Sequence, residues 1–148
     1  MALLRSFGSE KGLYDPTDWK KAAKIDMIVE TYTEVFNECW KILFETEFSA
    51  RPAATTVLRD GKLRRFLALC EKQLQANTAS KYISGDKMTI ADIVLTSFIW
   101  NVLRNEGGPF SEPFTAVLFT FPFFQAYGRR MQAEFIHQLR RRKRKNIF

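Results

Sequence analysis

The sequence predicts an all-α fold, and three observations support that class. Apolar residues recur at intervals of three and four, which is the period of an amphipathic helix. Two segments carry the residue types that start helices, one at Asp15-Pro16 and one at Thr89. Residues 117–121 are the one stretch with strand propensity, and because no second strand is expected to pair with them, they are interpreted as a helix end and a turn.

The first expected helix is long, from residue 16 to about residue 47. Asp15 is the expected N-cap, Pro16 suits the first helical position, and Asp18 favours the positive end of the helix dipole. Seven apolar residues then follow at spacings of 3-4-3-4-3-4, which places them on one stripe: Ala22, Ile25, Val29, Tyr32, Phe36, Cys39 and Leu43. Five more widen it: Trp19, Ile28, Val35, Trp40 and Phe44. We expect this helix to be the spine of a bundle.

A second helix is expected over residues 54–76, after a break at Arg51-Pro52. It carries an apolar stripe made of Leu63, Phe66, Leu67, Cys70 and Leu74. Gly61 weakens the prediction for its first half.

The start of the third helix is the strongest local signal. Thr89 offers a hydroxyl at the N-cap and Asp92 a carboxylate at the third helical position, as in a capping box. Met88 and Ile93 occupy the positions of the matching hydrophobic staple. These four residues are expected to be structural, and replacing Thr89 or Asp92 by alanine is expected to cost about 1 kcal/mol. The helix should run to about residue 105 and end at Gly107-Gly108-Pro109.

A short helical piece near residues 112–119 and a last helix opened by Pro122 bring the total to five or so helices. Residues 1–138 are therefore predicted to form one helical domain, and residues 139–148 a basic tail. Residues 129–148 hold eight Arg or Lys and one acid, and so carry the whole net charge of +7. Six consecutive cations in this tail are expected to bind a polyanionic surface such as RNA, tubulin or an acidic protein: Arg140, Arg141, Arg142, Lys143, Arg144 and Lys145. A solvated helix end is the alternative.

Cys39 and Cys70 are the only cysteines, and both fall in apolar stripes. This pattern favours buried structural thiols in the cytoplasm or another reducing compartment, and a protein that is not secreted. No run of eighteen apolar residues occurs, so no transmembrane segment is expected.

The order of these helices, with residues 82–92 between the second and the third, resembles the C-terminal helical domain of the cytosolic glutathione S-transferases. Residues 85–92, with Gly85, Asp86, Met88, Thr89 and Asp92, resemble that family's capping-box and staple motif. Residues 12–14 and 23–30 are similar to the linker and first helix of sigma-like members, and residues 121–127 to a later segment. The resemblance implies a bundle of that fold over nearly all of residues 5–142.

In that family a thioredoxin-like N-terminal domain supplies the residue that activates the glutathione thiol, and nothing similar is found in these 148 residues. The resemblance therefore implies no catalytic residue, metal or cofactor here, with glutathione bound only if a thioredoxin-like domain is paired with the chain. It also implies that Glu30 matches an acid that contacts the glutathione amino group across a dimer. From the residues alone, Glu30 belongs to an acidic strip that is expected to be solvated or partner-facing: Asp26, Glu30, Glu34 and Glu38.

Two other candidates remain. His137 is the only histidine, which excludes a histidine metal cluster or a Ser-His-Asp triad, and it is interpreted as a helix-end residue. Six phenylalanines near the C-terminus either pack on the core or line an apolar pocket: Phe110, Phe114, Phe119, Phe121, Phe123 and Phe124.

The function expected from these features is a non-catalytic interaction or scaffold module. A larger protein assembly would cover the face that the thioredoxin-like domain occupies in complete family members. The alternatives are a fragment or split subunit of a sigma-like glutathione transferase, which conjugates thiols to electrophiles, and a binder of a small apolar ligand.

Overall fold

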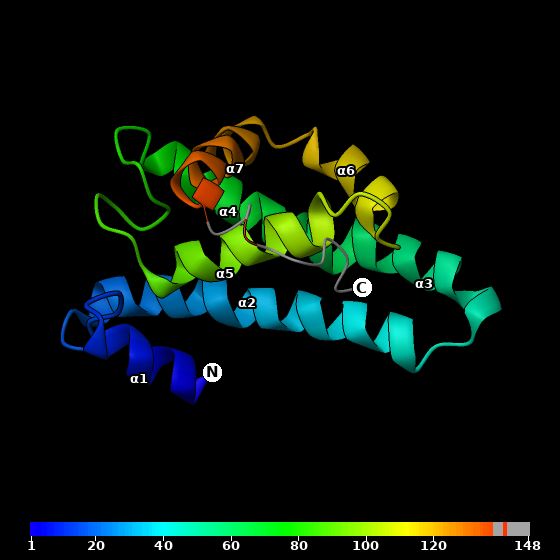
Figure 1. Ribbon diagram of the computed structural model, residues 1–148, viewed down its shortest axis with the longest axis horizontal. Helices are drawn as coiled ribbons and strands as arrows, with labels where there is room; N and C mark the ends of the chain where they lie inside the picture. The colour runs from blue at the N-terminus through cyan, green and yellow to red at the C-terminus, as the bar shows by residue number, and fades with distance from the viewer. Residues whose placement is uncertain (138–140, 142–148) are drawn as a thin grey trace.

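The computed structural model describes residues 1–137 and residue 141, and the regular secondary structure of these residues is helical. Figure 1 shows the helices in chain order, with bounds as follows: α1 Ala2–Glu10, α2 Trp19–Phe44, α3 Arg51–Leu58, α4 Arg64–Ala76, α5 Ile90–Phe98, α6 Ser111–Leu118 and α7 Pro122–Glu134. A 3-10 turn, Phe48–Ala50, precedes α3, and π-helical segments Arg59–Leu63 and Ile99–Leu103 continue α3 and α5. The described residues form no strand, so the predicted all-α class is confirmed.

α5 is the central helix, and α2 runs along one side of it while α4 and α7 lie on the other (Figure 1). Seven of its nine residues are buried, as expected for a helix enclosed on most sides: Ile90, Ala91, Asp92, Val94, Leu95, Thr96 and Phe98. α2 covers it with the predicted stripe, of which Ala22, Ile25, Val29 and Cys39 are buried. The long spine helix and the core around it therefore follow the apolar pattern of the sequence.

The ends of the first long helix differ from the prediction. α2 begins at Trp19, and its N-cap is Asp18, whose carboxylate accepts the Lys21 N–H at 3.1 Å. Asp15 instead accepts the N–H and hydroxyl of Thr17, which closes a turn before the helix. The helix ends at Phe44 rather than near residue 47.

The second helical region starts earlier than expected. Arg51-Pro52 begins α3, because proline is tolerated in the first turn of a helix, where its missing N–H has no partner to lose. α3, the π-helical segment and α4 form one continuous helical stretch, and Gly61 lies inside the π-helical segment. All five residues of the predicted stripe in this region are buried.

The N-terminal helix α1 was not predicted. It packs against the start of α5 at Gly8, where an added Cβ would lie 2.5 Å from Ile90 Cγ2. Beyond α1, the Gly8 carbonyl accepts the Leu13 N–H at 2.7 Å, and the Leu13 carbonyl accepts the Ile90 N–H at 3.1 Å. α1 is thus held at the N-terminus of α5 by a close backbone approach that only glycine permits.

A buried carboxylate joins three segments at the start of α5. Asp92 accepts the Thr89 N–H at 2.8 Å and the Thr89 hydroxyl at 2.9 Å, within a capping box. Its other oxygen accepts the Ile83 N–H at 3.0 Å and the Tyr127 hydroxyl at 2.8 Å. Met88 and Ile93, the expected staple residues, are both half-buried. Asp92 therefore links the loop before α5, the cap of α5 and the middle of α7.

Candidate functional site

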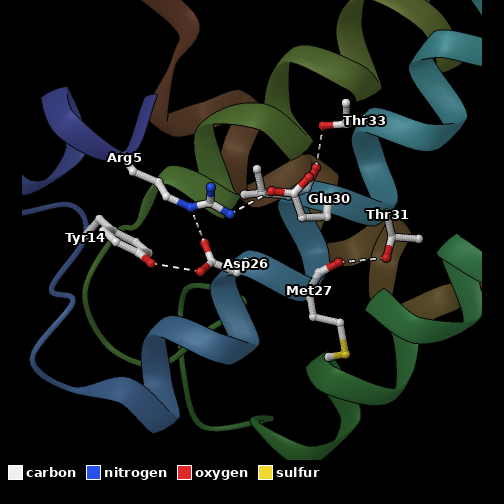
Figure 2. Close-up of polar contacts among 8 residues, drawn as sticks. Arg5, Tyr14, Asp26, Met27, Glu30, Thr31 and Thr33 are labelled. Atoms are coloured by element: carbon white, nitrogen blue, oxygen red, sulfur yellow. Dashed lines mark hydrogen bonds and ion pairs between the residues drawn. The ribbon is translucent and has the colours of Figure 1, made fainter. Parts of the chain in front are cut away.

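The acidic strip of α2 meets a cation from α1. Arg5 Nε donates to Asp26 Oδ1 at 2.8 Å, and Arg5 Nη2 donates to Glu30 Oε1 at 2.6 Å (Figure 2). The Tyr14 hydroxyl donates to the second oxygen of Asp26 at 2.8 Å. Because Asp26 and Glu30 are one helical turn apart, a single guanidinium spans both carboxylates. We call Arg5, Tyr14, Asp26 and Glu30 the α1–α2 ion cluster.

The protonation of the α1–α2 ion cluster follows from these contacts. The hydrogen bond to Asp26, followed by that to Glu30, raises the pKa of Arg5. Burial, and then the hydrogen bond to Asp26, raises the pKa of Tyr14. Arg5 is thus a permanent cation at neutral pH and Tyr14 a neutral donor. Sequence reasoning placed Asp26 and Glu30 on one face of a helix but missed Arg5, which lies 21 and 25 residues away from them along the chain.

The other two residues of the acidic strip, Glu34 and Glu38, have different surroundings. Glu34 is exposed, whereas Glu38 accepts a hydrogen bond from Lys62 Nζ at 2.7 Å, and Lys41 Nζ lies 3.9 Å away. The hydrogen bond to Lys62 lowers the pKa of Glu38. Half-exposed pairs of this kind each contribute up to about 1 kcal/mol to stability. The four acids therefore do not form one continuous anionic surface.

The six phenylalanines do not gather around one cavity. Phe110, Phe114 and Phe124 belong to the core, and the rings of Phe110 and Phe114 stack with centroids 5.1 Å apart. Phe121 is half-buried, while Phe119 and Phe123 are exposed. Packing thus accounts for the buried members, and only Phe110 lines one of the larger cavities.

His137 is exposed just beyond the end of α7, and Arg141 is exposed beyond it. The other five cations of the predicted polyanion-binding run, Arg140, Arg142, Lys143, Arg144 and Lys145, lie outside the described residues. The binding of a polyanion and the domain boundary at residue 138 both stay predictions. Within the described part of the chain, no group of three or more histidines, cysteines or acids is placed to hold a metal ion. No helix there is both long and apolar enough to cross a bilayer.

Both cysteines are free and buried. Burial raises the pKa of the Cys39 thiol to about 12 and raises the pKa of the Cys70 thiol further above its ordinary value. Neither thiol ionises at neutral pH in the folded protein, so neither is suited to act as a nucleophile.

We expect the stability of the protein to fall as the pH rises above about 9. Above this pH the two thiols ionise in the unfolded chain and stay protonated in the folded one. The stability that they contribute is therefore complete below the thiol pKa of the unfolded chain and is lost as the pH rises above it. Each thiol should lower the free energy of unfolding by up to about 1.4 kcal/mol per pH unit. Urea titrations at a series of pH values would measure this slope.

The double variant Cys39→Ala with Cys70→Ala is the control, because it removes both groups without adding a titrating one. Just above pH 9, the free energy of unfolding of this variant should fall less steeply with pH than that of the natural chain. The two substitutions also leave small cavities that lower the stability, but this loss does not depend on pH. An identical slope in the two proteins would contradict the expectation.

Comparisons with known proteins agree on one family. The profile described as the glutathione S-transferase C-terminal domain matches residues 33–134. Glutathione S-transferase A of Cavia porcellus is 30% identical over 101 residues, which are 68% of this chain and 45% of that protein. The crystal structure of the glutathione S-transferase Blo t 8 has a TM-score of 0.76 at 18% identity and covers 95% of this chain and 61% of its own, which shows a common fold. The chain thus spans less than half the length of the curated relative.

Proposed function

The chain belongs to the glutathione S-transferase family through its C-terminal helical domain, and from this we propose that it is a non-catalytic interaction module that docks in a larger protein assembly. The observation that carries the proposal is an exposed aromatic pair on α2. Trp40 and Phe44 lie one helical turn apart, with ring centroids 4.3 Å from each other, and are 48% and 61% exposed. Single exposed apolar residues are common, but adjacent large aromatics are typical of the centre of an interface.

α1 supplies further apolar surface. Leu3 and Phe7 are also one turn apart and are 75% and 60% exposed. A partner that covered either pair would remove this area from water and gain about 25 cal/mol per Å² of apolar surface. We place the module in the cytoplasm or another reducing compartment, where its two thiols would stay reduced. The basic run at residues 140–145 is proposed as a second, electrostatic contact with a polyanion or an acidic partner.

The α1–α2 ion cluster supports the non-catalytic proposal. Glu30, the residue that the family resemblance assigns to the glutathione amino group, already accepts a hydrogen bond from Arg5. An ammonium group would have to share this carboxylate with a guanidinium that Asp26 also holds in place. Two cations on one carboxylate repel each other, which disfavours the binding of a second one at Glu30.

The second candidate is a piece of a conventional transferase. The family match favours it, and the curated relative is more than twice as long as the matched region. In that case a thioredoxin-like domain in the same or another chain would supply the thiol-activating residue, and Glu30 would contact glutathione across a dimer. In this candidate the glutathione ammonium group would bind the second carboxylate oxygen of Glu30, while Oε1 stays with Arg5.

The test compares three tagged proteins recovered gently from cells that express the natural chain. They are the natural chain, the double variant Trp40→Ser with Phe44→Ser, and a control, Val57→Ser with Phe119→Ser. The control changes two residues that are at least as exposed, one on α3 and one just after the end of α6. We expect one set of larger proteins to co-purify with the natural chain and the control only. The purified partner should bind the α2 variant at least about thirtyfold more weakly, since an interface hot spot contributes about 2 kcal/mol or more.

Equal recovery by all three proteins would contradict the docking proposal for α2. Recovery of a longer form of the protein that is retained by immobilised glutathione would support the transferase candidate in its place.

A further inference from the structure

A cavity of about 420 Å³ opens at the end of the bundle where α2 ends and α3 and α6 begin. In Figure 1 this is the end at which the chain turns from α2 into α3, with α6 above it. Its walls are largely apolar and include Leu43, Phe48, Pro52, Phe110 and Pro113. The volume lies within the range of small-molecule pockets, which is about 300–1,000 Å³.

Arg51 is the one charged residue among those that line this cavity. Its Nε donates to the Thr46 carbonyl at 3.1 Å, and its guanidinium carbon lies 5.4 Å from the centroid of the Phe48 ring. These two contacts hold the guanidinium beside the cavity. Among the described residues its terminal nitrogens make no hydrogen bond, and no carboxylate forms an ion pair with it.

The other large cavity has a different character. It measures about 600 Å³ and lies between α2, α3 and the π-helical segment Arg59–Leu63. Three basic and two acidic residues line it, and Glu38 pairs there with Lys62 at 2.7 Å and with Lys41 at 3.9 Å. A lone cation beside apolar walls is therefore a feature of the first cavity and not of the second.

We propose that the cavity beside Arg51 binds an amphipathic anion, namely a medium-chain carboxylate or a compound of like shape. The hydrocarbon would lie against Leu43, Phe110 and Pro113, and the carboxylate would accept two hydrogen bonds from the terminal nitrogens of Arg51. A cationic amphiphile is disfavoured by the same guanidinium. A neutral one would bury the same apolar area but leave the guanidinium without an anion. The site shares no residue with the exposed pair on α2 or with the α1–α2 ion cluster, so it does not depend on the docking function.

The test is isothermal titration of the full chain with decanoate, and with decanol as the neutral analogue, both below the concentration at which they form micelles. Arg51→Gln should weaken decanoate binding by about tenfold, which is what the loss of a charge-assisted hydrogen bond implies, and leave decanol binding within about twofold. Arg51→Lys should restore most of the preference for decanoate because it keeps the charge. Arg59→Gln removes a positive charge outside the cavity and should leave the affinity for both ligands unchanged.

A fourth variant fills the cavity. Thr56 is exposed and lines it, so Thr56→Trp should exclude both ligands, with thermal unfolding as the check that the variant is folded. The proposal is overturned if decanoate gives no heat of binding with the natural chain, or if decanoate binds Arg51→Gln as tightly as the natural chain. It is also overturned if the folded Thr56→Trp variant binds both ligands normally.

Discussion

Replacing Asp92 by alanine is expected to lower the free energy of unfolding by about 4 kcal/mol, the range found when a buried charged network loses one member. The side chain is fully buried and accepts hydrogen bonds from Ile83, Thr89 and Tyr127. Its loss leaves a backbone N–H of the loop, the N–H at the cap of α5 and a buried phenol without partners, each of which costs about 1–3 kcal/mol. The sequence suggested a loss of about 1 kcal/mol, because it shows the cap and not the other two donors.

Urea unfolding followed by circular dichroism measures this change. Asp86→Ala is the matched control, since Asp86 is an exposed aspartate in the same loop, and its loss should be within about 0.5 kcal/mol. Tyr127→Phe, which removes one donor and keeps the ring, should have an intermediate effect. A loss for Asp92→Ala no larger than that for Asp86→Ala would show that the carboxylate does not hold these segments together.

Replacing Glu71 by alanine is expected to cost about 2–3 kcal/mol and to loosen the start of α7. Glu71 lies on α4 and is only 7% exposed. Its two carboxylate oxygens accept the Phe123 N–H at 3.0 Å and the Phe124 N–H at 2.7 Å, in the first turn of α7. These N–H groups have no partner within their own helix, and the positive end of the helix dipole adds to the attraction of the carboxylate.

The measurement is native-state hydrogen exchange of the amides of α7, together with the free energy of unfolding. Exchange at Phe123 and Phe124 should become faster in Glu71→Ala and remain slow in Lys72→Ala, which changes the exposed neighbour on the same helix. Glu71→Gln keeps one acceptor and should fall between the two. Unchanged protection of these two amides in Glu71→Ala would refute the capping function of this carboxylate.

Much of the bundle could be predicted from helical periodicity. The stripe of α4 is buried, and so is the middle of the α2 stripe, while Trp19, Trp40 and Phe44, which were expected to widen it, are exposed. The capping residues Thr89 and Asp92 mark the start of α5. These features are local, because each depends on residues within a few turns of one another. The same local signal placed the start of α2 three residues too early, since Asp15 and Asp18 are both residue types that cap helices.

The features that escaped prediction depend on partners far along the chain. Arg5 meets Asp26 and Glu30 from 21 and 25 residues away, and Glu71 meets Phe123 and Phe124 from 52 and 53 residues away. In the sequence Glu71 is one more charged residue on a helix, and nothing nearby indicates that it is buried. α1 has no side-chain cap, and it is held in place by the close approach of Gly8 to Ile90, which only the folded structure brings together.

The π-helical segment Arg59–Leu63 has a consequence for how this chain tolerates insertions and deletions. Leu58 and Leu63 are both buried although they lie five residues apart, a spacing that the wider turn of a π-helix brings onto one face. The segment therefore accommodates one residue more than an α-helix would need. Deleting a residue there would convert it to an α-helical turn without disturbing the apolar stripe on either side. Adding a residue to α3 or α4 instead would rotate one stripe by about 100° relative to the other.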